Sequence, residues 1–319
     1  FFYQRRDKKF KCLPEMRKSC LDTIYDLAKI DSKILFIGSD LGPRVLDEFK
    51  KNIPDRFLME GVSEQSIIGM SAGLALEGFK PYVNTIATFI TRRCFEQIIV
   101  DLCLHNLSVR LIGNGGGLVY APLGPTHQAI EDISILRVLP NMTILAPCDA
   151  IEMTALVRET LDHKGPVYIR IARGGEEIIT NSNEKIKISK GVLKKKPKKH
   201  LFITTGVMTQ IALKASEDLK KKGIECGVLH LATIKPLDKE ILSYWIPKVK
   251  KIITVEEGLL AGGFGSSILE FCSDNFPNDT HKISRIGLKD SFVEKYGTQE
   301  LLFKDNNLTK ECLIAEMLK

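Results

Sequence analysis

Gly61-Val62-Ser63-Glu64-Gln65 joins a short apolar run at 57–59 to a segment rich in small residues at 64–76. This order predicts a strand, a turn and a helix that begins at Glu64. In open α/β sheets, ligands bind at the carboxyl ends of the strands, which is where this turn would lie. Taken alone, a carboxylate there is explained by the helix dipole, which it stabilises by about 0.3–1 kcal/mol. The stretch therefore predicts an α/β fold and makes Glu64 a candidate site residue.

Short β-branched runs alternate with segments of helical period on both sides of this stretch. Such alternation is typical of a parallel sheet covered by helices on both faces. In the first half we expect strands at 34–37, 57–59, 82–85, 109–112, 142–145 and 167–170. We expect helices between them at 16–28, 64–76, 91–104, 127–136 and 150–161. The first half is therefore predicted to form one doubly wound, mostly parallel sheet.

A smaller α/β unit is predicted for the second half of the chain. Its expected strands are 201–204, 227–230, 252–255 and 283–286. The polar stretch 180–185 ends the first pattern, and the lysine run 194–199 after it is expected to form a hairpin turn. We therefore divide the chain into domains 1–183 and 184–319.

Composition excludes several classes of protein. The 319 residues are 44% hydrophobic and 27% charged, which is ordinary for a soluble globular chain. No apolar run is long enough to span a bilayer, so we expect no membrane association and a cytoplasmic location. The net charge of +7 is concentrated in the lysine run, so no nucleic-acid partner is expected. The eight cysteines form no CxxC pair, which predicts reduced, buried thiols.

A second candidate motif is Gly124-Pro125-Thr126-His127-Gln128, shortly after the glycine run 115–117. Glycine and proline predict a tight turn, with His127 at the head of the next helix. A lone histidine at such a position is usually a capping or surface residue. Placed over the same sheet edge as Glu64, however, it predicts a functional site built from both residues.

The chain resembles the C-terminal half of transketolases in four motifs that follow the family's order. These are 61–65, the aromatic segment 88–97, 124–128, and 255–257 with the glycine-rich 262–266. The resemblance runs from about Arg17 to the C-terminus. The same order occurs in 1-deoxyxylulose-5-phosphate synthase, which 257–265 resembles more closely. The resemblance implies a pyrimidine-binding domain over 1–183 and a transketolase C-terminal domain over 184–319.

Such domains are parts of thiamine-diphosphate enzymes. In the family, a separate domain holds the diphosphate through Mg²⁺ with a Gly-Asp-Gly motif, and this chain contains no Gly-Asp-Gly. The resemblance therefore implies a split enzyme, in which a second subunit supplies the diphosphate and Mg²⁺ half. An α₂β₂ assembly is expected, and this chain is expected to provide no metal ligand.

The resemblance also implies roles for individual residues. Glu64 matches the carboxylate that hydrogen-bonds the aminopyrimidine ring and so activates the cofactor. His127 matches a histidine that contacts the oxygen of the donor substrate and stabilises the intermediate. Phe89 matches an aromatic residue that packs on the pyrimidine, and Asp40 matches an acidic residue near the cofactor. Glu64 and His127 are thus the expected catalytic residues.

Four arginines are the expected substrate contacts, because guanidinium groups bind phosphate with paired hydrogen bonds. Arg17 and Arg173 fall where transketolases place phosphate-binding arginines. Arg93 falls on a substrate-contacting arginine of the synthase, and Arg44 replaces a phosphate-contacting serine. A phosphorylated or carboxylated small molecule is therefore the expected substrate.

The chain departs from the family's pattern at four positions of the expected site. Ile86 and Arg92 stand where the family has aromatic residues in the cofactor pocket. Gly115 replaces a histidine that contacts substrate phosphate, and Leu123 replaces an aspartate that binds a hydroxyl of the acceptor. An apolar Leu123 would leave that hydroxyl unpaired, so the standard pentose-phosphate substrates are not expected.

The expected function is transfer of a two-carbon ketol unit to an aldehyde or ketone acceptor, including a specialised or branched sugar. The donor is a ketose, or a 2-oxo acid after decarboxylation. One alternative is a pyruvate-decarboxylating carboligase like 1-deoxyxylulose-5-phosphate synthase. The β subunit of a 2-oxo acid dehydrogenase is a more distant alternative. A non-catalytic subunit that has kept the fold is a third.

Overall fold

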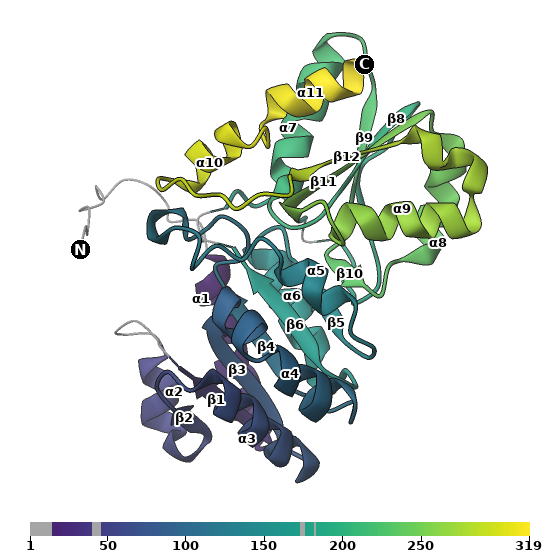
Figure 1. The fold of residues 1–319 in the computed structure, drawn as a ribbon. Coiled ribbons are helices and arrows are strands. Elements are labelled where there is room, and N and C mark those ends of the chain that lie inside the picture. Colours follow the sequence, from purple (N-terminus) through teal and green to yellow (C-terminus); the bar gives the residue numbers. More distant parts are fainter. Residues whose placement is uncertain (1–14, 40–45, 173–175, 182) are drawn as a thin grey trace.

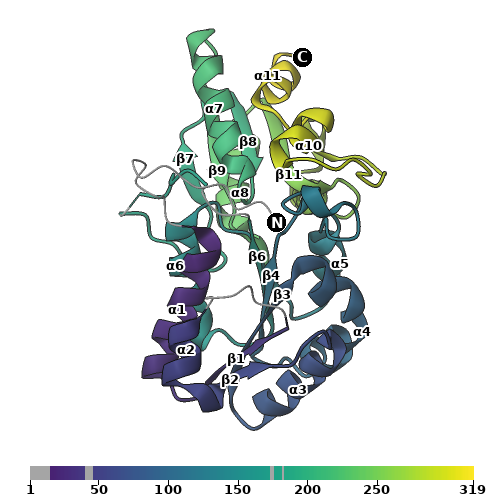
Figure 2. The ribbon, with the colours of Figure 1, turned by 90° about the vertical axis from the view of Figure 1, so that its left-hand side faces the viewer.

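The protein, seen here in a computed structural model, is described over residues 15–39, 46–172, 176–181 and 183–319. Two mostly parallel sheets form its two lobes, at the lower left and the upper right of Figure 1. Helices lie on both faces of each sheet (Figures 1 and 2). The α/β class predicted from the alternating pattern is therefore confirmed.

Seven strands form the first sheet, in the order β10-β5-β6-β4-β3-β1-β2. They are β1 (Ile34–Gly38), β2 (Phe57–Met59), β3 (Lys80–Ile86), β4 (Arg110–Asn114), β5 (Thr143–Leu145), β6 (Val167–Ile171) and β10 (Thr233–Lys235). All neighbours pair in parallel except β10, which is antiparallel to β5. Every residue of β1, β4, β5 and β6 is buried, which explains why these strands are mostly apolar.

Helices cover the two faces of this sheet, as Figure 2 shows edge-on. One face carries α1 (Met16–Ile30) and α6 (Ala150–Glu159), which pack against each other over an apolar core. The other face carries α3 (Glu64–Leu76), α4 (Phe95–Gln97) and α5 (Asp132–Arg137). The short α2 (Asp47–Asn52) lies beside β2 in Figure 1. Helix α3 has the bounds predicted from the sequence.

Five strands form the second sheet, in the order β12-β11-β8-β9-β7. They are β7 (Val192–Lys195), β8 (His200–Thr204), β9 (Cys226–His230), β11 (Lys251–Leu259) and β12 (Ile283–Leu288). Its helices are α7 (Met208–Lys221), α8 (Lys239–Trp245), α9 (Phe264–Asn275), α10 (Gln299–Asp305) and α11 (Lys310–Leu318). Helices α7 and α11 pack on one face of the sheet, over a core that includes Phe202 and Leu313. The glycine-rich 262–265 leads into α9.

Three local expectations were wrong. The predicted helix 127–136 begins only at Asp132, because backbone hydrogen bonds between Gly117 and Ala129 keep the preceding chain extended. His127 therefore lies in a turn and does not head a helix. The lysine run does not form a hairpin, because its strand β7 pairs with β9 and not with the next strand β8. The predicted helix 91–104 consists largely of π-helical turns at Phe89–Arg93 and Ile98–Cys103.

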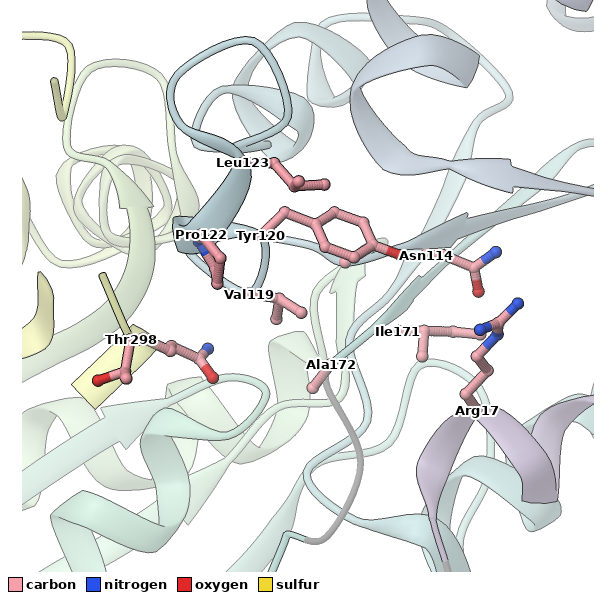
Figure 3. A pocket seen from close by; sticks show the side chains of 11 residues that line it. Arg17, Asn114, Val119, Tyr120, Pro122, Leu123, Ile171, Ala172 and Thr298 are labelled. Atoms are coloured by element: carbon pink, nitrogen blue, oxygen red, sulfur yellow. The ribbon is translucent and has the colours of Figure 1, made fainter. Parts of the chain in front are cut away.

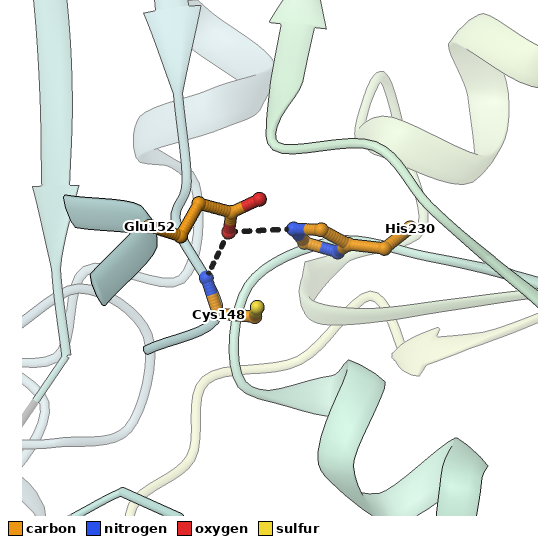
Figure 4. Close-up of side chains that lie close together, drawn as sticks. All are labelled: Cys148, Glu152 and His230. Atoms are coloured by element: carbon orange, nitrogen blue, oxygen red, sulfur yellow. Dashed lines mark hydrogen bonds and ion pairs between the residues drawn. The ribbon is translucent and has the colours of Figure 1, made fainter. Parts of the chain in front are cut away.

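Buried polar side chains join the two lobes. Arg170 of β6 binds the carboxylate of Asp132 through Nε and Nη2 and also reaches the backbone oxygen of Glu257 in β11, at 2.8 Å. His230, at the end of β9, donates or accepts a 2.8 Å hydrogen bond with Glu152 of α6, which also accepts from the backbone of Cys148 (Figure 4). Both groups are almost fully buried. The lobes are thus joined by buried hydrogen bonds of Arg170 and His230.

Two further expectations concern the whole chain. The seven cysteines that the structure describes are all unpaired, and six of them are buried, as predicted. Among the described residues, no helix has both the length and the apolar character needed to cross a membrane.

Candidate active site

Glu64 lies at the first position of α3, just beyond the carboxyl end of β2. The turn before it has Gly61 at a positive φ of 65°, and the Ser63 hydroxyl closes it by donating to the Glu60 carbonyl oxygen at 2.8 Å. The Glu64 side chain is only 5% exposed, and its Oε2 accepts a hydrogen bond from Arg93 Nη1 at 3.2 Å. The turn and Arg93 line a cavity of about 330 Å³. The carboxylate is therefore buried beside a ligand-sized space.

Phe89 and Arg93 belong to one π-helical turn that follows β3. The Arg93 guanidinium lies 3.8 Å from the centre of the Phe89 ring. This is a close cation–π contact, and π-helical turns occur often at functional sites. The turn thus presents a planar cation stacked on an aromatic ring and bonded to the Glu64 carboxylate.

His127 packs against the other side of this group. Its ring lies 5.2 Å from the Phe89 ring and 6.4 Å from that of Tyr120, both edge-on. Its Nδ1 hydrogen-bonds Thr126 Oγ1 at 2.8 Å. Burial lowers the pKa of His127, and the positive charge of Arg93 adds to the effect. The imidazole is therefore held neutral near pH 7, when it can donate or accept one hydrogen bond.

Tyr120 continues the line of contacts into a second cavity of about 350 Å³ (Figure 3). Arg17 of α1, the ends of β4 and β6, the loop 119–123 and the start of α10 line this cavity. The Nε atom of Arg17 is buried and has no hydrogen-bond partner among the residues that the structure describes. A buried cationic donor without a partner is poised to bind an anion.

The structure therefore brings together four of the predicted residues, Glu64, Phe89, Arg93 and His127, and places Arg17 in the adjoining cavity. Ile86 ends β3, half-buried. Arg92 points elsewhere: it pairs with Glu131 and donates to the Gln128 carbonyl oxygen.

The sites predicted at Asp40, Arg44 and Arg173 lie outside the described residues. Sequence reasoning missed Tyr120, Asn114 and the residues Thr298 and Gln299 of the second lobe. One signal in the sequence was available for Tyr120. Gly115 stands where the family has a histidine, and the missing side chain leaves space for the aromatic Tyr120 five residues later.

One buried group has the chemistry of a metal site, and it lies in the junction. The ligand atoms of Cys148, Glu152 and His230 lie within 4.8 Å of one another. Hydrogen bonds already join Glu152 to His230 and to the Cys148 backbone. We assign no metal to it.

Comparison with protein families gives two matches in sequence order. The model of the transketolase pyrimidine-binding domain matches residues 14–175, and the model of the transketolase C-terminal domain matches 189–311. One of the apulose-4-phosphate transketolase subunits of Phocaeicola vulgatus is 34% identical, over 95% of this chain and 96% of that protein. A putative transketolase C-terminal section of Methanocaldococcus jannaschii is 35% identical, over 90% of each chain.

Longer proteins also match. A 1-deoxy-D-xylulose-5-phosphate synthase of Microcystis aeruginosa is 35% identical, over 93% of this chain but 46% of its own length. The chain spans about half the length of the synthases it matches. Among solved structures, a split-gene transketolase described as an inactive β4 tetramer superposes with a TM-score of 0.87 and 31% identity, over 95% of this chain and 97% of that one.

Proposed function

Since the chain belongs to the transketolase family, we propose that it is one subunit of a thiamine-diphosphate-dependent transferase that moves a two-carbon ketol unit to an aldehyde or ketone acceptor. The observation that supports this most is the continuous line of contacts from Glu64 through Arg93 and Phe89 to His127. A carboxylate, an aromatic face and a neutral imidazole are the groups that this chemistry requires from the pyrimidine-binding side.

The residues present fit the aminopyrimidine end of the cofactor. The Arg93 guanidinium is planar, donates to the Glu64 carboxylate and lies on the Phe89 ring. An aminopyrimidine ring is also planar and can make the same two interactions with the same two residues. The contacts of Arg93 with Glu64 and Phe89 therefore support a place for such a ring between these two residues. Its side chain is 45% exposed, so it is free to move aside when a ligand binds.

Bound thiamine diphosphate supplies a stabilised carbanion equivalent, so the protein has to bind, orient and shield it. Glu64 would hold a proton at the pyrimidine ring nitrogen, since its carboxylate is buried and accepts from cationic donors. Phe89 would orient the ring and exclude water from one of its faces. His127, whose pKa is lowered chiefly by burial, would hydrogen-bond the oxygen of the substrate.

A partner chain is part of the proposal. The chain contains no Gly-Asp-Gly motif and spans half the length of the synthases. It also aligns end to end with relatives whose names mark them as one transketolase subunit and as a transketolase C-terminal section. We infer that the partner holds the diphosphate and Mg²⁺ and that the two form an α₂β₂ assembly. The unpaired, mostly buried thiols support a reducing compartment such as the cytoplasm.

The substrate is proposed to be a small phosphorylated or carboxylated carbonyl compound, because Arg17 offers a buried unpaired donor to the second cavity. A second candidate function is a pyruvate-decarboxylating carboligation. It is favoured by the match to 1-deoxy-D-xylulose-5-phosphate synthases over nearly the whole chain. Carbon dioxide release from pyruvate, measured against transfer from a ketose phosphate, distinguishes the two.

Calorimetry with thiamine diphosphate and Mg²⁺ tests the proposal, using the chain alone and co-expressed with the polypeptide that supplies Gly-Asp-Gly. We expect tight binding only with the partner. In that complex Glu64→Gln should keep the fold but lower turnover by roughly 10²–10⁴-fold, the usual worth of a positioned proton-transfer group. The matched control is Glu60→Gln, an exposed glutamate of the same turn, which should leave turnover unchanged.

Two results would contradict the proposal. Turnover by the chain without a partner would exclude the split enzyme. A complex that binds no cofactor would instead favour the non-catalytic subunit.

A further inference from the structure

Gly115 follows β4 and has a positive φ of 74°. Because glycine has no side chain, the space beside its Cα atom is open to another residue. A Cβ atom built on Gly115 would overlap the ring of Tyr120, closer than any real side chain approaches. The Tyr120 ring therefore lies directly on the backbone of Gly115. It fills the volume that any side chain at position 115 would need.

Tyr120 is held in this position from two other sides. The His127 ring meets it edge-on at 6.4 Å. Its backbone is fixed in a tight turn, because Leu123 N donates to the Tyr120 carbonyl oxygen at 2.8 Å. The ring is thus packed between β4 and His127, at the point where the two parts of the candidate active site meet.

The cavity beside Tyr120 has two chemically different ends. Of the described residues that line it, only Arg17 is charged, and its Nε has no partner. Val119, Pro122 and Leu123 make the other end apolar. Figure 3 shows the Tyr120 ring in the middle of this group, between Leu123 and Asn114. Tyr120 shares this cavity with Arg17, and its ring also contacts that of His127.

The second lobe supplies the opposite wall through Thr298 and Gln299. Gln299 Nε2 donates to Glu257 Oε1 at 2.7 Å, and the same oxygen accepts from Leu118 N at 2.7 Å. These bonds hold the Gln299 amide in place. The Gln299 side chain on this wall is thus tied by Glu257 to the backbone of Leu118, two residues before Tyr120.

We propose that Tyr120 is a specificity-determining residue that sets the length of the substrate. Its ring limits the room between Arg17 and His127, so a short anionic carbonyl compound is accepted and longer sugar phosphates are excluded. This inference rests on the proposed function, because it assumes that the anion binds at Arg17 and that the carbonyl lies near His127.

Acceptor length tests the inference in the complex of the chain with its partner. The probes are glyceraldehyde 3-phosphate, erythrose 4-phosphate and ribose 5-phosphate, and kcat/KM is measured for each. We expect the unmodified complex to favour the three-carbon probe. Tyr120→Ala should raise the ratio of five-carbon to three-carbon kcat/KM by roughly tenfold or more, while Tyr120→Phe keeps the original ratio. Tyr244→Ala, an exposed tyrosine of α8, is the control that should change nothing.

The outcomes separate this inference from the proposed function. Transfer that occurs with an unchanged length preference in Tyr120→Ala overturns the role of Tyr120 and leaves the function standing. If no probe is turned over, the proposed function fails. Calorimetric binding of glycerol 3-phosphate and ribitol 5-phosphate then decides the inference: tighter binding of the longer polyol phosphate by Tyr120→Ala supports it, and equal binding overturns it. Tyr120→Leu replaces the alanine variant if circular dichroism shows that the latter is unfolded.

Discussion

Arg93 connects the groups of the candidate active site at the scale of single residues. Its guanidinium pairs with Glu64, stacks on Phe89 and acts on His127 through its charge. The pKa of His127 lies below its ordinary value of 6.5, first because of burial and then because of Arg93. A lowered pKa keeps the imidazole neutral as the pH falls, so chemistry that needs neutral His127 extends further into the acid range.

Replacing Arg93 should therefore raise the pKa of His127. In Arg93→Gln we expect the pKa to move towards 6.5 without reaching it, because the burial remains. Titration of the His127 ring by NMR measures this directly. Arg92→Gln is the matched control, since Arg92 is paired with Glu131 and should leave the titration as it is. Equal shifts in both variants, or no shift in Arg93→Gln, would contradict the assignment.

Motifs predicted part of the site because their residues follow strands of one sheet. Glu64, Phe89 and His127 all lie beyond the carboxyl ends of strands, so a parallel sheet brings them to one edge. Tyr120 could not be predicted in the same way. The missing side chain at Gly115 indicates only that space is left there, and the contact of Tyr120 with the edge of His127 is not visible in a linear sequence.

Elements were predictable where local periodicity and tertiary packing agree. Helix α3 and the buried strands have the expected places because their apolar patterns match their surroundings. Strands β7 (Val192–Lys195) and β10 (Thr233–Lys235) both end in lysine and contain only short apolar runs, so neither carries a clear strand pattern of its own. The start of α5 was misplaced because a tertiary contact, the bridge between Gly117 and Ala129, overrides the local helix signal.

Glu256 of β11 gives helix α9 a pH dependence. Its two carboxylate oxygens accept from Phe264 N and Gly265 N, both at 2.7 Å, and satisfy the first turn of the helix. Burial nevertheless raises the pKa of Glu256 from 4.5 to about 7. Because the folded-state pKa is the higher one, its contribution to stability is complete below pH 4.5 and is lost as the pH rises through 7.

Glu256→Gln should remove this titration. The difference in unfolding free energy between the original protein and the variant should fall by about 3 kcal/mol between pH 4.5 and pH 8, measured by urea denaturation. Glu270→Gln on the same helix is the control. The hydrogen bond from Arg137 lowers the pKa of Glu270 and outweighs the effect of burial. The difference in unfolding free energy between the original protein and Glu270→Gln should therefore stay nearly constant over that range. A constant difference for Glu256→Gln as well would show that its carboxyl titrates normally.

At the scale of the whole molecule, buried polar groups of both lobes meet at their junction, among them Glu152 and His230. Burial alone would raise the pKa of Glu152, but His230 and the Cys148 backbone bring it below its ordinary value. The resulting stabilisation is present above pH 4.5 and is lost as the pH falls through the lowered pKa. Acid should therefore loosen the junction.

Breaking this pair should be costly. Glu152→Leu or His230→Leu leaves a buried partner without compensation, so each should lower the unfolding free energy by roughly 3–5 kcal/mol. The double variant should lose less than the sum of the two, which a double-mutant cycle in denaturant measures. Lys214→Gln, which breaks an exposed pair with Glu177, is expected to change stability by less than about 1 kcal/mol. If the losses of unfolding free energy in the two single variants simply add up in the double variant, the interaction between Glu152 and His230 contributes nothing to stability.

Strand β10 places a condition on how this polypeptide is made. The edge of the first sheet pairs Leu145 with Thr233 and Ile144 with Lys235, and Ala146 N donates to Ala232 O at 2.7 Å. A ribosome therefore has to synthesise β7, β8, α7 and β9 before the strand that closes this edge emerges from the exit tunnel. Until then β5 carries an open row of amides and carbonyls, the kind of edge that invites pairing with a neighbouring nascent chain. Translation speed through that interval, and chaperones that shield the growing chain, then govern the yield of correctly assembled protein.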